Sequence, residues 1–237
     1  MEETLKSKQP WYHNRSYVAT AIALAFHVSG FIAIGFFRSP LFISLTPLNL
    51  LVGLALVLYT QRELTTPFWM FCIASFGIGF ASELVGVNTG LLFGEYRYGK
   101  VLGPGMKGVP WLIGVQWMVT MYCIGVSMDM LHRRLMTNQG ELYGRFPRWW
   151  MTLSTVADGA LLSVLFDWAL EPVAVHLGYW QWHNGTIPFK NYWSWWLVSL
   201  LILIIFRWLP FRKHNLFAIH LLLTQFMFFL LLRTFMK

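Results

Sequence analysis

Three acidic residues near the ends of two long apolar segments could perform acid–base chemistry. Glu83 lies near the end of segment 67–86, and Asp167 and Glu171 lie near the end of segment 149–171. Asp167 and Glu171 are four residues apart, a spacing that puts both side chains on one face of a helix. Carboxyl groups that share an apolar cleft shift each other's protonation, so one can donate a proton while another accepts one. We therefore predict that Glu83, Asp167 and Glu171 are the catalytic residues.

Two further acidic residues lie in apolar segments at other positions. Asp129 is followed closely by two arginines, which favours an ion pair. Asp158 precedes Asp167 by nine residues, about half a turn around a helix, so its side chain points elsewhere. For Asp158, an interhelical hydrogen bond and a supporting role in the site both remain open.

Several other chemistries lack their sequence patterns. The chain has neither HxxHH nor HxxxH, which membrane di-iron enzymes require, and no GxGxxG follows a strand. The last apolar segment contains no lysine, which excludes a retinal Schiff base there. Cys72 and Cys123 lie in apolar runs without companion ligands, so we interpret them as core residues. We expect no metal and no cofactor.

The composition indicates the environment in which this chemistry would take place. Of the 237 residues 57% are apolar and only 12% are charged, whereas soluble domains carry charge on about a quarter. The mean hydropathy is +0.53. We expect a single-domain (1–237), all-α, polytopic membrane helix bundle. The net charge of +8 comes from basic residues between the apolar runs, so it indicates lipid headgroups as partners and not nucleic acid.

A membrane-spanning helix needs about 20 mainly apolar residues. Scanning for segments of that length predicts about seven transmembrane helices. They cover residues 17–37, 41–59, 67–86, 109–131, 149–171, 192–209 and 216–235.

The basic residues of the loops predict the orientation. Eleven lie on the side of the N-terminus, among them Lys6, Lys8 and Arg145, and seven lie on the other side. This bias puts the N-terminus in the cytoplasm. The two long outer loops, 87–108 and 172–191, are rich in glycine and aromatic residues, so we expect them to cover the outer mouth of the bundle. Frequent glycines predict that 87–108 is irregular and not a continued helix.

Two sets of motifs resemble those of a known family. The first set is ELVGVNTGLLFGEYRY at 83–98, LG at 102–103 and GVP at 108–110. The second is DWALEP at 167–172, GYWQW at 178–182, IP at 187–188, NY at 191–192 and Trp195. Together they resemble the carotenoid hydratases, membrane enzymes of bacteria and haloarchaea that hydrate the 1,2 double bond of acyclic carotenoid ends. The resemblance covers roughly residues 80–200.

The resemblance implies a cofactor-independent hydro-lyase in a bacterial or archaeal cell membrane, acting on a carotenoid within the bilayer. Hydrating such an alkene needs a proton donor, tolerance of a tertiary carbocation and one water. The carboxyls can supply the acid and base, although the sequence does not assign which is which. Aromatic faces can stabilise the cation. The predicted substrate-binding residues are Tyr96, Trp117, Trp168, Trp180, Trp182 and Tyr192. The predicted supporting residues are Asp158, Thr89 and Asn191.

Two alternatives remain open from the residues alone. A carotenoid cyclase would use the same protonation, but a neighbouring double bond would capture the cation and the product mass would not change. A non-catalytic carotenoid- or lipid-binding subunit would hold its pigment without changing it.

Overall fold

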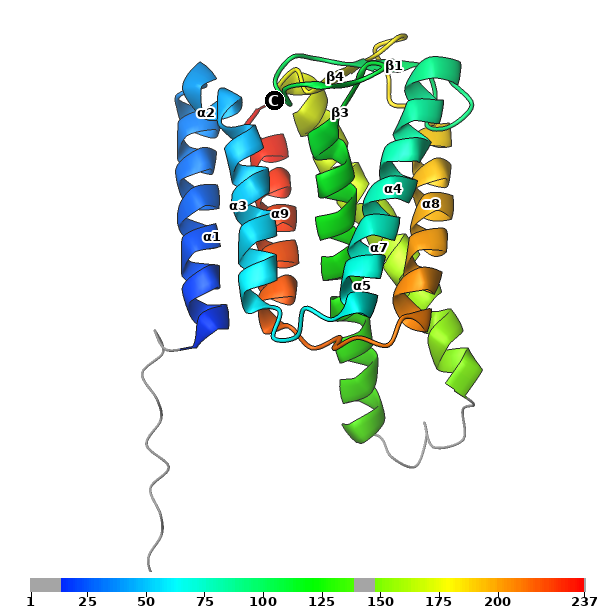
Figure 1. Ribbon diagram of the computed structural model, residues 1–237. Helices are drawn as coiled ribbons and strands as arrows, with labels where there is room; N and C mark the ends of the chain where they lie inside the picture. Colours follow the sequence, from blue (N-terminus) through cyan, green and yellow to red (C-terminus); the bar gives the residue numbers. More distant parts are fainter. Residues whose placement is uncertain (1–13, 139–147, 237) are drawn as a thin grey trace, which may run out of the picture.

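The computed structural model describes residues 14–138 and 148–236. Its helices stand side by side as a bundle, with short strands at one end (Figure 1). The helical elements are α1 (Arg15–Phe31), the π-helical turn η2 (Ile32–Phe36), α2 (Pro40–Ser44), α3 (Thr46–Thr60), α4 (Thr66–Thr89), α5 (Trp111–Asn138), α7 (Arg148–His176), α8 (Phe189–Trp208) and α9 (Leu216–Phe235). The strands are β1 (Tyr96–Tyr98), β2 (Gly105–Met106), β3 (Val109–Pro110) and β4 (Trp180–Trp182).

The expected all-α membrane bundle is confirmed. Within the described residues, six helical segments are long and apolar enough to cross a membrane: α1 with η2, α4, α5, α7, α8 and α9. The chain is thus an integral, multi-pass membrane protein. Lys6, Lys8 and Arg145, which entered the orientation estimate, lie outside the described residues.

The second expected span is divided between two short helices. It corresponds to α2 and α3, and α3 has only 15 residues. Pro47 in the first turn of α3 has no backbone N–H to donate, so the helical ladder does not continue from α2. The pair nevertheless runs beside the long helices (Figure 1).

Helix ends place the two acidic segments at the same end of the bundle. Helix α4 begins with Pro67 in its first turn and ends at Gly90, whose φ of 65° is the left-handed conformation typical of a helix stop. Helix α7 ends just before Gly178, which has a φ of 73°. Glu83 and Glu171 therefore both lie within about two turns of the end that carries the strands.

The segments 90–110 and 177–188, which we call the cap, cover this end of the bundle (Figure 1). Strand β1 pairs antiparallel with β4, so that Tyr96 lies opposite Trp182 and Tyr98 opposite Trp180. Alternate residues of a strand share one face, which turns these four aromatic side chains in the same direction. The expectation that 87–108 is irregular and packs on the bundle is confirmed for most of its length, although α4 extends to Thr89.

The opposite end of the bundle contains a separate ionic cluster. Asp129 of α5 is 2% exposed and accepts hydrogen bonds from Arg133 Nε at 2.6 Å and from Arg207 Nη1 at 2.5 Å. This confirms the expected ion pair and leaves Asp129 with a structural role.

Candidate active site

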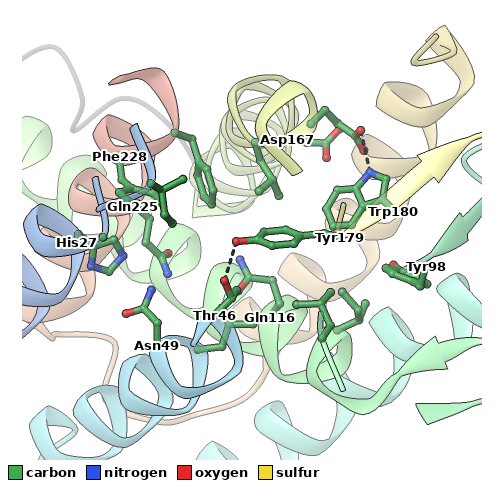
Figure 2. A pocket seen from close by; sticks show the side chains of 18 of the residues that line it. His27, Thr46, Asn49, Tyr98, Gln116, Asp167, Tyr179, Trp180, Gln225 and Phe228 are labelled. Carbon is green, nitrogen blue, oxygen red and sulfur yellow. Dashed lines mark hydrogen bonds between the residues drawn. The ribbon is translucent and has the colours of Figure 1, made fainter. Parts of the chain in front are cut away.

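A cavity of about 470 Å³ lies between the helices beneath the cap. Its wall includes residues from α1, α3, α4, α5, α7, α8 and α9 and from the cap. Glu83, Asp167 and Glu171 all line it, and each is at most 5% exposed. The structure thus brings the three predicted carboxyls to one buried cavity, part of which Figure 2 shows.

Glu83 is fully supplied with hydrogen-bond donors. Tyr96 and Tyr98 donate their hydroxyls to Oε2, the latter at 2.7 Å, and Trp117 donates Nε1–H to Oε1 at 2.9 Å. Burial and the charge of Glu83 raise the pKa of Tyr96 and Tyr98 well above the usual value for tyrosine, so both phenols remain donors. Three donors stabilise the ionised carboxylate and tie α4 to α5 and to the cap.

Two glycines on the same face of α4 make room for these donors. Gly79 lies four residues before Glu83, and a Cβ there would be 2.3 Å from the Trp117 ring. Gly86 lies three residues after Glu83, and a Cβ there would be 2.9 Å from the Tyr96 hydroxyl. A side chain at either position would displace an aromatic donor from the carboxylate.

Asp167 and Glu171 form a second carboxyl site, bridged by Asn191. The Asn191 amide donates to Asp167 Oδ2 at 2.6 Å and to Glu171 Oε1 at 3.4 Å. Glu171 Oε2 also accepts from Trp180 Nε1 at 3.0 Å and from Trp182 Nε1 at 2.9 Å. Asp167 Oδ1, in contrast, is buried and has no hydrogen-bond partner within the described residues.

This asymmetry distinguishes the two carboxyls chemically. Two carboxylates in one buried site repel each other, so the pair is better accommodated with one proton. Glu171 has three N–H donors around it, which suits a negative charge, whereas Asp167 has one, on Oδ2, and its Oδ1 has none within the described residues. The proton is therefore best placed on Asp167 Oδ1. The arrangement can hold a proton donor beside an ionised carboxylate.

Aromatic rings surround the carboxyls. Trp117 stacks on Trp195, with ring centroids 4.1 Å apart and an interplanar angle of 23°. Tyr96 lies 5.1 Å from Trp182, centroid to centroid. Of the six aromatic residues predicted to bind substrate, four line the cavity: Tyr96, Trp117, Trp180 and Trp182. Such faces can stabilise a transient cation without reacting with it.

The other two predicted aromatic residues lie outside the cavity. Trp168 is 44% exposed, and the Arg233 guanidinium lies 3.9 Å from its ring centroid. Tyr192 is half-buried and is absent from the cavity wall. Each directly follows an inward residue, and one step along a helix rotates the side chain by about 100°.

The predicted supporting residues also divide. Asn191 lies at the centre of the site. Asp158 lies nine residues before Asp167 in α7, is exposed and accepts a hydrogen bond from Ser154. Its carboxyl is 3.2 Å from His132 Nε2. Thr89 is exposed at the end of α4, and its hydroxyl donates to a backbone carbonyl one turn earlier.

Sequence reasoning did not assign several residues of the cavity wall to the site, although two of them, Tyr98 and Trp195, lie in the motifs. Tyr98 could have been found from Tyr96, because residues two apart in a strand share a face. Trp195 could have been found from Asn191, four residues earlier in α8. His27 and Gln225 are isolated polar residues in apolar helices, and no pattern in the sequence links them.

Comparisons with known proteins agree with the motifs. Residues 45–237 match a family described as "Carotenoid biosynthesis protein". The chain is also similar to bisanhydrobacterioruberin hydratase of Haloarcula japonica, with 31% identity over 174 residues. That similarity covers 71% of this chain and 50% of the relative, so the chain spans about half the length of the curated relative that it matches. No solved structure matches the chain.

Proposed function

Because this chain belongs to the carotenoid biosynthesis protein family, we propose that it is an enzyme that adds water to the terminal 1,2 double bond of an acyclic carotenoid end group. The observation that carries the proposal is Asp167, which lines an aromatic cavity beside two carboxyls that each accept three hydrogen bonds, and whose own Oδ1 has no hydrogen-bond partner within the described residues. The similarity to a hydratase supports the same reaction.

The first step is protonation of the alkene. Asp167 Oδ1 gives its proton to C2, the π electrons form the new C–H bond, and a tertiary cation remains at C1. An apolar, water-poor surrounding keeps the carboxyl protonated until the alkene arrives. Asn191 holds the other oxygen of Asp167 and so fixes the direction of the proton.

The cation is stabilised by the cavity wall. The stacked rings of Trp117 and Trp195 offer π faces, and Glu83 supplies a negative charge that its three donors hold in place. We assign proton acceptance to Glu171, because Asn191 bridges it to Asp167, and Glu83 then acts through its charge.

Water capture completes the reaction. Glu171 accepts a proton from the attacking water, whose oxygen forms the C1–O bond. The proton then passes from Glu171 to its neighbour Asp167, which restores both groups. The sum is one alkene plus one water giving one tertiary alcohol, with no cofactor consumed.

The cavity also suits a lipid-soluble substrate. Its wall includes Phe26 of α1, 39% exposed, and Leu48 of α3, 48% exposed, so the cavity reaches the apolar outer surface between these helices. An end group can occupy the cavity while the rest of the polyene stays in the bilayer.

Expression of the gene in cells that accumulate an acyclic carotene tests the proposal. The expected product is heavier by one water and carries a tertiary hydroxyl, and its yield should fall sharply with Asp167→Asn. A product of unchanged mass with a new ring would identify a cyclase. Unchanged pigment that co-purifies with the protein would indicate a binding subunit.

A further inference from the structure

The end of the cavity away from the carboxyls is also polar. His27 of α1, Asn49 of α3 and Gln225 of α9 line it. Figure 2 shows their side chains turned toward one another, with Tyr179 between them and Asp167. We call His27, Asn49 and Gln225 the second polar cluster. These three residues have no role in the proposed hydration.

The hydrogen bonds of His27 leave one ring nitrogen free. Its Nδ1 lies 2.7 Å from the carbonyl oxygen of Ala23. A carbonyl can only accept, so Nδ1 carries the hydrogen, and in the neutral imidazole Nε2 is then an acceptor. Nε2 has no hydrogen-bond partner among residues 14–138 and 148–236.

The side-chain oxygen of Gln225 is in a similar position. Its side chain is 94% buried, being 6% exposed, and Oε1 has no hydrogen-bond partner in the part of the chain that is described. A buried carbonyl without a donor destabilises the fold, so this oxygen is poised for a ligand that donates. The neighbouring Asn49 amide offers both a donor and an acceptor.

We propose that the second polar cluster is a subsite for a hydroxyl group of the lipid-soluble ligand. An O–H can donate to His27 Nε2 or Gln225 Oε1 and accept from an amide N–H, which matches what the cluster lacks. A hydrocarbon at the same place would leave all these groups unpaired. The subsite therefore selects oxygenated isoprenoids, an inference that rests on the proposed function for the class of ligand.

The position of the cluster explains how a long ligand reaches it. Phe26 and Leu48, the exposed residues through which the cavity reaches the lipid-facing surface, directly precede His27 and Asn49. A ligand hydroxyl bound here lies between the carboxyls and this opening. The subsite thus recognises a hydroxyl on the part of the ligand that lies between the reacting end group and the opening.

Paired ligands test the subsite by binding alone. The purified full-length protein in detergent is titrated with farnesol and with 2,6,10-trimethyl-2,6,10-dodecatriene, the same skeleton without the hydroxyl, and followed by tryptophan fluorescence. Partitioning into micelles is the same for all variants, so the ratio of the two dissociation constants isolates the subsite. Gln225→Met and Asn49→Leu should each reduce the preference for farnesol by about tenfold. Thr224→Val, on the same helix but off the cavity wall, should leave the ratio unchanged.

The result separates the subsite from the proposed reaction. An unchanged ratio in both cluster variants, weakened binding of both ligands alike, or no farnesol binding by the wild type would overturn the subsite. If one cluster variant fails to fold, the other decides. A shifted ratio in a protein without hydratase activity would support the subsite and reject the reaction, and hydratase activity with an unchanged ratio would do the reverse.

Discussion

Replacing Asp167 with asparagine separates proton donation from structure. In the wild type, Oδ2 accepts from Asn191 at 2.6 Å and Oδ1 has no partner within the described residues. An asparagine can turn its amide oxygen toward Asn191 and its NH₂ toward the cavity, so the hydrogen bond is kept. The free energy of unfolding should then change by no more than about 1 kcal/mol.

The catalytic effect of the same change should be large. Asp167→Asn removes the acidic proton, and loss of a general acid lowers turnover by about 10²–10⁴-fold, equivalent to about 2.7–5.4 kcal/mol in the barrier. The assay measures alcohol formed per mole of purified protein, with an acyclic carotene supplied in liposomes. Thermal unfolding of the same samples measures stability.

Asp129→Asn is the matched control at the opposite end of the bundle. It removes the charge that pairs with Arg133 and Arg207, and Arg207 is largely buried. The expected loss is about 2–4 kcal/mol of stability, with turnover per folded molecule unchanged. Normal specific activity of Asp167→Asn would refute the assignment of the acid. Loss of specific activity in Asp129→Asn alone would show that the reaction takes place at the end of the bundle near Asp129 and not at the end near Asp167.

Three further changes test the supports of the site. Asn191→Leu removes the amide that bridges the two carboxyls, and turnover should fall at least about tenfold in the liposome assay; unchanged turnover would contradict the bridging role. Gly79→Ala should push the Trp117 ring from its place and cost about 1–3 kcal/mol in thermal unfolding, whereas Gly77→Ala, with open space around its Cβ, should be neutral or stabilising. Burial raises the pKa of Tyr179 from 10.0 to about 12. The stabilisation of the folded state by the protonated phenol is therefore fully present below about pH 10 and is lost as the pH rises toward 12. The free energy of unfolding measured across that range should depend less on pH in Tyr179→Phe than in the wild type. Equal pH dependence in both proteins would contradict the assignment of this effect to Tyr179.

The shared location of the three carboxyls could be predicted from the sequence. Hydropathy fixes the spans and their alternating directions, and these put Glu83 and Glu171 at one end. The four-residue spacing of Asp167 and Glu171 fixes their common face. Both predictions need only local periodicity and the order of the helices.

The rest depends on contacts between distant segments. The pairing of β1 with β4 joins residues more than 80 positions apart through strands of three residues, which are too short to carry a pattern. The rotation of α7 decides that Asp167 lines the cavity and Trp168 does not, and the face of strand β4 decides that Trp180 does. The second polar cluster draws one residue from each of three helices, and neither spacing nor motif links them.

Isotope labelling of the product tests the central claim most directly. Purified protein is incubated with an acyclic carotene in H₂¹⁸O, and in parallel in D₂O, and the product is analysed by mass spectrometry and NMR. Hydration predicts one ¹⁸O in the tertiary hydroxyl at C1 and one deuterium bound to carbon at C2. Oxygen that derives from O₂, or a product without added oxygen, would contradict protonation by Asp167 followed by capture of water.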